Sequence, residues 1–149
     1  MTDTGEVLFA DTGNNRIRKV DSNGTIVTIA GNGTADFTGD WVLATETALN
    51  QPQSVAYLNG EVYIADTNNN RVRKILANGT IITIAGNGIG DHCGDDDFAI
   101  EACVNHPVSV VVNRVGEVFI SDESNSFVRK VDISGIISRI AGTPMWMGG

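Results

Sequence analysis

Short runs of apolar, β-branched and aromatic residues alternate along the chain with turn-forming Asn, Gly, Asp and Pro. Such runs predict β-strands, and the best-defined set covers residues 54–58, 61–66, 71–76 and 80–85. Asn59-Gly60 and Asn78-Gly79 separate neighbouring strands, and an Asn-Gly pair predicts a hairpin because both residues tolerate positive φ. The pattern therefore predicts an antiparallel, four-stranded meander.

The meander is repeated along the chain. A Gly-Glu-Val run, followed four residues later by Asp, begins at Gly5, Gly60 and Gly116, which sets offsets of 55 and 56 residues. Four-stranded units at a fixed period of about 40 to 55 residues are typical of β-propeller blades. We therefore expect an all-β fold with a partial blade over residues 1–31, blades over 51–86 and 108–142, and linkers over 32–50 and 87–107.

The repeated motifs point to a known family. Residues 65–74 and 82–88 resemble the NHL repeat, in its long form with an extended linker between blades. The resemblance runs from about Gly5 to Gly142, and it implies a β-propeller. The third copy departs from the pattern at Phe127, where the earlier copies have Arg, and at Ser121, where they have Ala.

Three copies with eleven expected strands do not make a closed ring, since the first copy starts at its second strand. Closed propellers have about four to eight blades, and an open stack leaves bare apolar faces and unpaired edges. We expect a piece of a longer propeller, a homo-oligomer or a part of a larger assembly. The residues from Met145 to Met147 either supply a swapped strand to a partner or form a frayed tail.

The charge is uneven. The chain has 18 acidic and 10 basic residues, a net charge of −8, which disfavours binding to nucleic acid or to an anionic membrane surface. The linkers contain no Lys or Arg and predict an acidic face suited to a cation or a basic protein patch. Their acidic residues are Asp36, Asp40, Glu46, Asp91, Asp95, Asp96, Asp97 and Glu101.

Two sequence features bear on the cellular compartment. No apolar run is long enough to predict a membrane span, and the first residues lack the pattern of a signal peptide. Cys93 and Cys103 lie in one linker, and a disulfide between them indicates an oxidising, extracellular or secreted setting. Two reduced thiols are the alternative.

An Asp-x-x-Asn-x-Arg pattern recurs and favours a structural role, because one active site needs no copying. Asp and Asn bind turn amides, and Arg is expected to pair with a carboxylate between blades. The residues concerned are Asp11, Asn14, Arg16, Asp66, Asn69, Arg71 and the matching Asp122.

Asp91, Asp95, Asp96 and Asp97 raise the hypothesis of a calcium site, because calcium prefers carboxylate and carbonyl oxygens. Their spacing is not that of an EF-hand, and a solvated acidic loop is the alternative. One branch of the NHL family is an amidating lyase with metal-bound histidines at the propeller axis. This chain has two histidines, His92 and His106, which do not supply the three-His set of a typical catalytic zinc site.

These observations favour a non-catalytic module that binds protein, another copy of itself included, without a cofactor. The alternative function is an extracellular sensor that binds a ligand or calcium. Recognition of RNA, which some NHL proteins perform on a basic loop face, conflicts with the acidic linkers.

Overall fold

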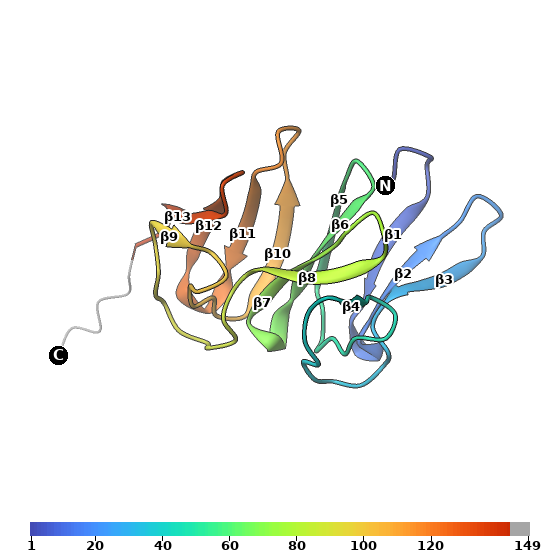
Figure 1. Ribbon diagram of the computed structural model, residues 1–149, viewed down its shortest axis with the longest axis horizontal. Coiled ribbons are helices and arrows are strands. Elements are labelled where there is room, and N and C mark those ends of the chain that lie inside the picture. Colours follow the sequence, from blue (N-terminus) through green and yellow to red (C-terminus); the bar gives the residue numbers. More distant parts are fainter. Residues whose placement is uncertain (144–149) are drawn as a thin grey trace.

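A computed structural model describes residues 1–143 as three antiparallel sheets that lie side by side in chain order (Figure 1). We call the sheets blades 1 to 3. Blade 1 contains β1 (Val7–Asp11), β2 (Arg16–Val20) and β3 (Ile26–Ala30). The predicted swapped strand at residues 145–147 lies outside the described residues.

Blades 2 and 3 each contain the predicted four-stranded meander. Blade 2 consists of β5 (Ser54–Leu58), β6 (Glu61–Asp66), β7 (Arg71–Ile75) and β8 (Thr80–Ala85). Blade 3 consists of β10 (Pro107–Val112), β11 (Val118–Asp122), β12 (Phe127–Val131) and β13 (Ile136–Ala141). The predicted all-β architecture of incomplete propeller type is confirmed, and the strands of blade 2 agree with their predicted ranges to within one residue.

Two further strands come from the linkers and were not predicted. β4 (Val42–Leu43) pairs with β8, and β9 (Asp97–Phe98) pairs with β13. Each linker therefore adds a fifth strand to the outer edge of the blade that follows it in the chain. We call residues 32–50 linker 1 and residues 87–106 linker 2.

One turn of 3-10 helix joins two neighbouring strands in each blade, namely β1 and β2, β6 and β7, and β11 and β12. These turns are η1 (Thr12–Asn14), η2 (Thr67–Asn69) and η3 (Glu123–Asn125). A residue in the left-handed conformation ends each turn, namely Asn15, Asn70 and Ser126. No helix within residues 1–143 is long and apolar enough to cross a membrane.

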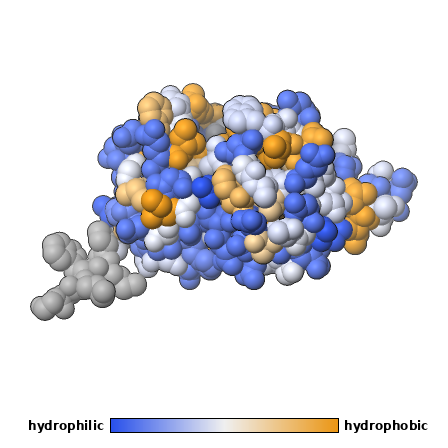
Figure 2. Space-filling view, turned by 60° about the horizontal axis from the view of Figure 1, so that its bottom comes forward, coloured by the Kyte–Doolittle hydropathy of each residue, from blue (hydrophilic) through white to orange (hydrophobic). Residues whose placement is uncertain are grey.

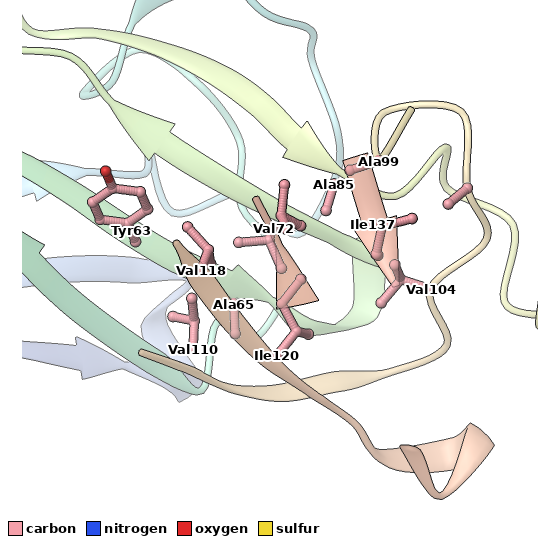
Figure 3. Close-up of a cluster of buried hydrophobic side chains, with 12 residues drawn as sticks. Tyr63, Ala65, Val72, Ala85, Ala99, Val104, Val110, Val118, Ile120 and Ile137 are labelled. Carbon is pink, nitrogen blue, oxygen red and sulfur yellow. The ribbon is translucent and has the colours of Figure 1, made fainter. Parts of the chain in front are cut away.

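The buried apolar side chains form two clusters, one between each pair of neighbouring blades. The cluster between blades 2 and 3 combines Val72 and Ala65 with Val118 and Ile120 (Figure 3). Linker residues complete both clusters: Ala44 and Leu49 in the first, and Ala99, Ala102 and Val104 in the second. The linkers are thus part of the core, and not only loops on one face.

The glycine after each outer strand is a position of close approach. Gly86 follows β8 with φ +90°, and a Cβ there would collide with the carbonyl oxygen of Asn70. Gly31 and Gly142 meet the equivalent carbonyls of Asn15 and Ser126. These glycines let the chain leave the outer strand directly against the 3-10 turn.

We expect Gly86→Ala to lower the free energy of unfolding by about 3 kcal/mol, because it adds a backbone collision to an unfavourable φ. Gly24→Ala is the matched control: its φ is +79°, but a Cβ there meets nothing within 4 Å. It should cost about 1 kcal/mol. Urea unfolding of both variants checks this, and equal losses would contradict the collision.

Candidate functional site

One Asp, one Asn and one Arg lie together in each blade, beside the 3-10 turn at the end of β1, β6 or β11. In blade 2, Asp66 Oδ2 accepts a hydrogen bond from Asn69 Nδ2 at 2.8 Å and one from Arg73 Nη1 at 3.3 Å. The side chains of Asp66 and Arg73 are fully buried. We call each such trio a clamp. The clamps are Asp11, Asn14 and Arg18 in blade 1, Asp66, Asn69 and Arg73 in blade 2, and Asp122, Asn125 and Arg129 in blade 3.

The blade 2 clamp holds linker 1 at three points along its length, through one carboxylate, one amide and one guanidinium. The contacts are Asn50 N–H to Asp66 Oδ1 (2.8 Å), Asn69 Nδ2 to the carbonyl of Asp36 (2.8 Å) and Arg73 Nη2 to Asp40 Oδ1 (3.0 Å). Thr83 Oγ1 also donates to Asp40 Oδ1 at 3.0 Å. The buried polar groups of the clamp are therefore largely satisfied by the linker.

The blade 3 clamp holds linker 2 in the same way. The contacts are Asn105 N–H to Asp122 Oδ1 (2.8 Å), Asn125 Nδ2 to the carbonyl of Asp91 (2.9 Å) and Arg129 Nη2 to Asp95 Oδ1 (2.9 Å). Asp40 and Asp95 follow a glycine in each linker, Gly39 and Gly94. The clamp thus recognises the same Gly-Asp step in both linkers.

Burial and hydrogen bonding act in opposite directions on the blade 2 clamp. Burial raises the pKa of Asp66 above its ordinary value, while the Asn50 N–H, Asn69 and Arg73 favour its charged form. Arg73 Nε is buried without a hydrogen-bond partner. A buried, partly compensated carboxylate makes this clamp sensitive to the loss of its arginine.

The arginine that pairs with the carboxylates is not the one expected from the sequence. Asp66 lies directly opposite Arg71 in the strand register, but its ion pair is with Arg73. Arg71 instead donates to the carbonyls of Asn69 and Asn87 and lies 3.7 Å from the ring centroid of Phe37. Arg16 makes the matching pair of backbone contacts in blade 1. The prediction that Arg16 and Arg71 pair with carboxylates between blades is therefore wrong.

Linker 2 is closed by a disulfide where linker 1 uses a hydrogen bond. Cys93 and Cys103 are bonded, with their Cα atoms 4.8 Å apart, within the normal range for a disulfide. At the equivalent positions of linker 1, Thr38 Oγ1 accepts a hydrogen bond from the N–H of Ala48 at 2.9 Å. The predicted disulfide is present, and it replaces a contact that the repeat already makes.

The four aspartates of the calcium hypothesis have other partners or point to solvent. Asp95 is paired with Arg129 and with His92, whose Nε2 lies 3.0 Å from Asp95 Oδ2. Asp91 and Asp97 each accept the N–H of the next residue through Oδ1. In the described part of the chain, no three His, Cys, Asp or Glu side chains are grouped to hold a metal ion. The hypothesis gains no support from the geometry.

The acidic linker face is smaller than predicted, because Asp40 and Asp95 point toward buried arginines. The two histidines are bound to different segments: His92 stacks edge-on against Phe127, and His106 Nδ1 lies 3.3 Å from Glu123 Oε2. His92 and Phe127 occupy the places that Phe37 and Arg71 have in the preceding repeat. This explains the departure of the third copy at Phe127.

Hollows of similar make-up lie between neighbouring blades. The hollow between blades 1 and 2 measures about 400 Å³ and that between blades 2 and 3 about 280 Å³. Equivalent residues line both, for example Lys19 and Lys74, but Leu8 in the first is replaced by the larger Tyr63 in the second. A hollow that recurs with the repeat is a packing feature and does not mark one site.

A third hollow of about 410 Å³ lies beside linker 1 and was not predicted. Trp41, which is 74% exposed and has φ 64°, lines it with Phe37, Arg71 and Ile100. Elsewhere on the surface, apolar residues lie in separate patches among hydrophilic ones, as Figure 2 shows for one face. The sequence could not predict that Trp41 is exposed, because an apolar run such as Trp41-Val42-Leu43 fits a buried strand equally well.

Blades joined by clamped linkers define this chain as a β-propeller segment. The NHL repeat matches residues 49–75, and the Teneurin NHL domain matches residues 87–147. The chain belongs to the NHL-repeat family.

Among known proteins, NHL repeat-containing protein 2 of Bos taurus is 36% identical over 121 residues, covering 76% of this chain and 16% of that protein. Teneurin-4 of Mus musculus is 30% identical over 99 residues, covering 58% and 4%. The chain therefore spans a small part of the length of these relatives.

Solved structures share the fold. A structural genomics protein of unknown function from Bacteroides thetaiotaomicron has a TM-score of 0.73 and 23% identity, covering 84% of this chain and 32% of its own. Virginiamycin B lyase from Staphylococcus aureus has a TM-score of 0.62 and 17% identity, covering 100% of this chain and 41% of the lyase. At these identities the likeness concerns the fold alone.

We expect Arg73→Met to lower the free energy of unfolding by about 3 to 5 kcal/mol, because it leaves Asp66 buried without its cation. Arg18→Met is the matched control, since the Arg18 side chain is 26% exposed and should contribute about 1 kcal/mol or less. Urea unfolding measures both.

The loss in Arg73→Met should shrink as the pH falls. Without Arg73 the pKa of folded Asp66 rises further, so the neutral carboxyl, which needs no counterion, is favoured at acidic pH. A loss that is equal for both arginines, or that grows on acidification, would contradict the assignment.

Linker 1 provides the design for a disulfide variant. Cys93→Thr with Cys103→Ala copies Thr38 and Ala48 and should lose about 2 to 3 kcal/mol of stability, the contribution of a short closed loop. Cys93→Ala with Cys103→Ala should lose about 1 kcal/mol more, because it also lacks the threonine hydrogen bond. Unfolding under oxidising conditions compares them, and equal stability of the two variants would argue against the equivalence of the linkers.

Proposed function

We propose that this chain is a non-catalytic protein-interaction module, which binds protein through the two end faces of its row of blades. The face of blade 1 away from blade 2 is here called the leading face, and the face of blade 3 away from blade 2 the trailing face. The supporting observation is that both expose residues whose equivalents are buried between blades.

The leading face carries Val7 at the start of β1. Val7 is 48% exposed, whereas the equivalent Val62 and Val118 are 8% and 3% exposed in the clusters between blades. The residue is valine at all three positions. The exposure of Val7 therefore measures the lack of a neighbouring sheet.

The trailing face carries Val111 and Ile140, which are 55% and 50% exposed. Ile140 corresponds to Ile29 and Ile84, which pack against the two clusters between blades. Ala141 is exposed, whereas the equivalent Ala30 and Ala85 are fully buried. Exposed apolar residues on one face of a sheet favour association.

The leading and trailing faces are the two kinds of surface that pack together between neighbouring blades. In both observed interfaces the leading face of one blade packs on the trailing face of the blade before it. A second copy could therefore join head to tail, and such contacts form a ring when the rotation closes. Two copies would supply six blades, a number within the range of closed propellers.

The proposal includes an oxidising compartment and excludes a catalytic role. The disulfide in linker 2 supports the first, because such bonds persist mainly in extracellular or secreted proteins. For the second, the recurring Asp, Asn and Arg side chains hold linkers in blades 2 and 3, a structural task that accounts for their repetition. The remaining acidic residues of the linkers complement a partner protein with a basic surface.

We expect the chain to form oligomers at micromolar concentration, measured as mass by size-exclusion chromatography with light scattering. Val7→Glu on the leading face and Ile140→Glu on the trailing face should each lower the mass to that of one chain, because a buried, unpaired carboxylate opposes the contact.

Head-to-tail contact also predicts that the two variants complement each other. An equimolar mixture of the two variants retains one intact leading face and one intact trailing face, so it should form a dimer that neither variant forms alone. Ile133→Glu, at an exposed turn residue, is the control. A stable monomer of the unmodified chain would contradict self-association, and failure of the mixture to complement would contradict head-to-tail contact.

A further inference from the structure

The clamp of blade 1 is the same trio as in blades 2 and 3, but no linker lies in it among the described residues. Arg73 and Arg129 each bind a linker carboxylate, and their side chains are fully buried. Arg18 pairs with Asp11 and is 26% exposed. The guanidinium of Arg18 therefore has room for a further anionic partner.

A threonine beside the arginine indicates where that partner would bind. In blade 2, Thr83 and Arg73 both donate to the same oxygen, Asp40 Oδ1, each at 3.0 Å. In blade 1, the equivalent Thr28 accepts directly from Arg18 Nη1 at 3.1 Å. A carboxylate that entered between Thr28 and Arg18 would reproduce the blade 2 arrangement.

The amide and the carboxylate of this clamp also lack linker contacts. Asn69 and Asn125 each donate to a linker carbonyl as well as to the clamp aspartate. Asn14 donates to Asp11 Oδ1 and is exposed. In blade 1, Asn14 thus binds the carboxylate oxygen that in the other clamps accepts a linker N–H.

The outer edge of β3 carries backbone carbonyls equivalent to those that accept hydrogen bonds from the linkers in blades 2 and 3. In blade 2, the N–H groups of Trp41 and Ala44 donate to the carbonyls of Ile81 and Gly79 at 2.8 and 3.0 Å. In blade 3, those of Asp96 and Ala99 donate to Ile137 and Gly135 at 2.7 and 2.9 Å. The equivalent carbonyls of blade 1 belong to Ile26 and Gly24, on the edge where β3 ends its sheet.

Burial changes at the same edge. Ile26 is 57% exposed, whereas Ile81 and Ile137, its equivalents beneath β4 and β9, are fully buried. The side chain is not the cause of the contrast, because all three residues are isoleucine. Ile81 and Ile137 pack against the neighbouring blade and pair with a linker strand, and Ile26 has neither among the described residues. A short linker strand is therefore the segment that pairs with this edge in the other two blades.

We propose that the blade 1 clamp and the outer edge of β3 form a docking site for a linker segment of another NHL repeat. The segment has a Gly-Asp step, whose carboxylate binds Arg18 and Thr28, followed by a short strand that pairs with β3. The linkers of this chain are acidic and contain no Lys or Arg, which complements the partly exposed Arg16 and Arg18. The site goes beyond the proposed contact of blade faces, in which the described residues supply no linker to this clamp.

The test uses the isotope-labelled full chain with Ile140→Glu, which blocks the trailing face and leaves blade 1 unchanged. A synthetic peptide that copies residues 34–50 is titrated to millimolar concentration and followed by NMR. We expect saturable shifts of the Gly24 and Ile26 amides and of the Arg18 Nε–H. A peptide with Asp40→Asn should bind at least about tenfold more weakly, because it loses charge-assisted hydrogen bonds.

Arg18→Met in the labelled chain should weaken binding of the unmodified peptide by a similar factor, and it should remove the difference between the two peptides. Absence of shifts at blade 1, or equal binding of the two peptides to the chain with Arg18, would overturn the docking site. The result is separable from self-association. If the unmodified chain is monomeric by light scattering but the labelled chain binds the peptide, the ring is refuted and the docking site stands. If the unmodified chain forms oligomers but the labelled chain does not bind the peptide, the docking site is refuted and self-association stands.

Discussion

The buried guanidinium of each complete clamp is the interaction on which this architecture depends. Arg73 and Arg129 are fully buried between carboxylates of their own blade and of the linker. A buried charge is tolerated when it is paired and hydrogen-bonded, so the linker has to lie where its carbonyls and Gly-Asp step can reach. The same placement sets the fifth strand on the blade and the linker's apolar residues in the core.

The two linkers show how one geometry is met by different chemistry. A threonine hydrogen bond in linker 1 corresponds to the disulfide of linker 2. The cation–π contact of Arg71 with Phe37 corresponds to the aromatic contact of Phe127 with His92. In each case both positions change residue type and remain in contact with each other. The clamp itself keeps its residue types in all three blades, and in blades 2 and 3 it satisfies buried charge.

Exposure at equivalent positions is the clearest evidence on association. Val7, Ile26 and Ala141 differ in exposure from identical residues in the neighbouring blades, and the residue type is not the cause. Each difference is explained by a neighbouring sheet or linker that covers the position in one blade and not in another. The bare faces belong to blades 1 and 3, and the open clamp belongs to blade 1. The faces favour contact with another blade, whereas the clamp favours contact with a linker segment.

The sequence alone determined the repeat, the strands and their hairpins, because these follow from local periodicity and turn residues that recur at a constant offset. It did not reveal β4 and β9, since a strand of two residues has no period of its own and exists through its partner. Nor could it select Arg73 over Arg71. Residues two apart share one face of a strand, and the tertiary structure chose between them by burying Arg73 beside Asp40 and stacking Arg71 on Phe37.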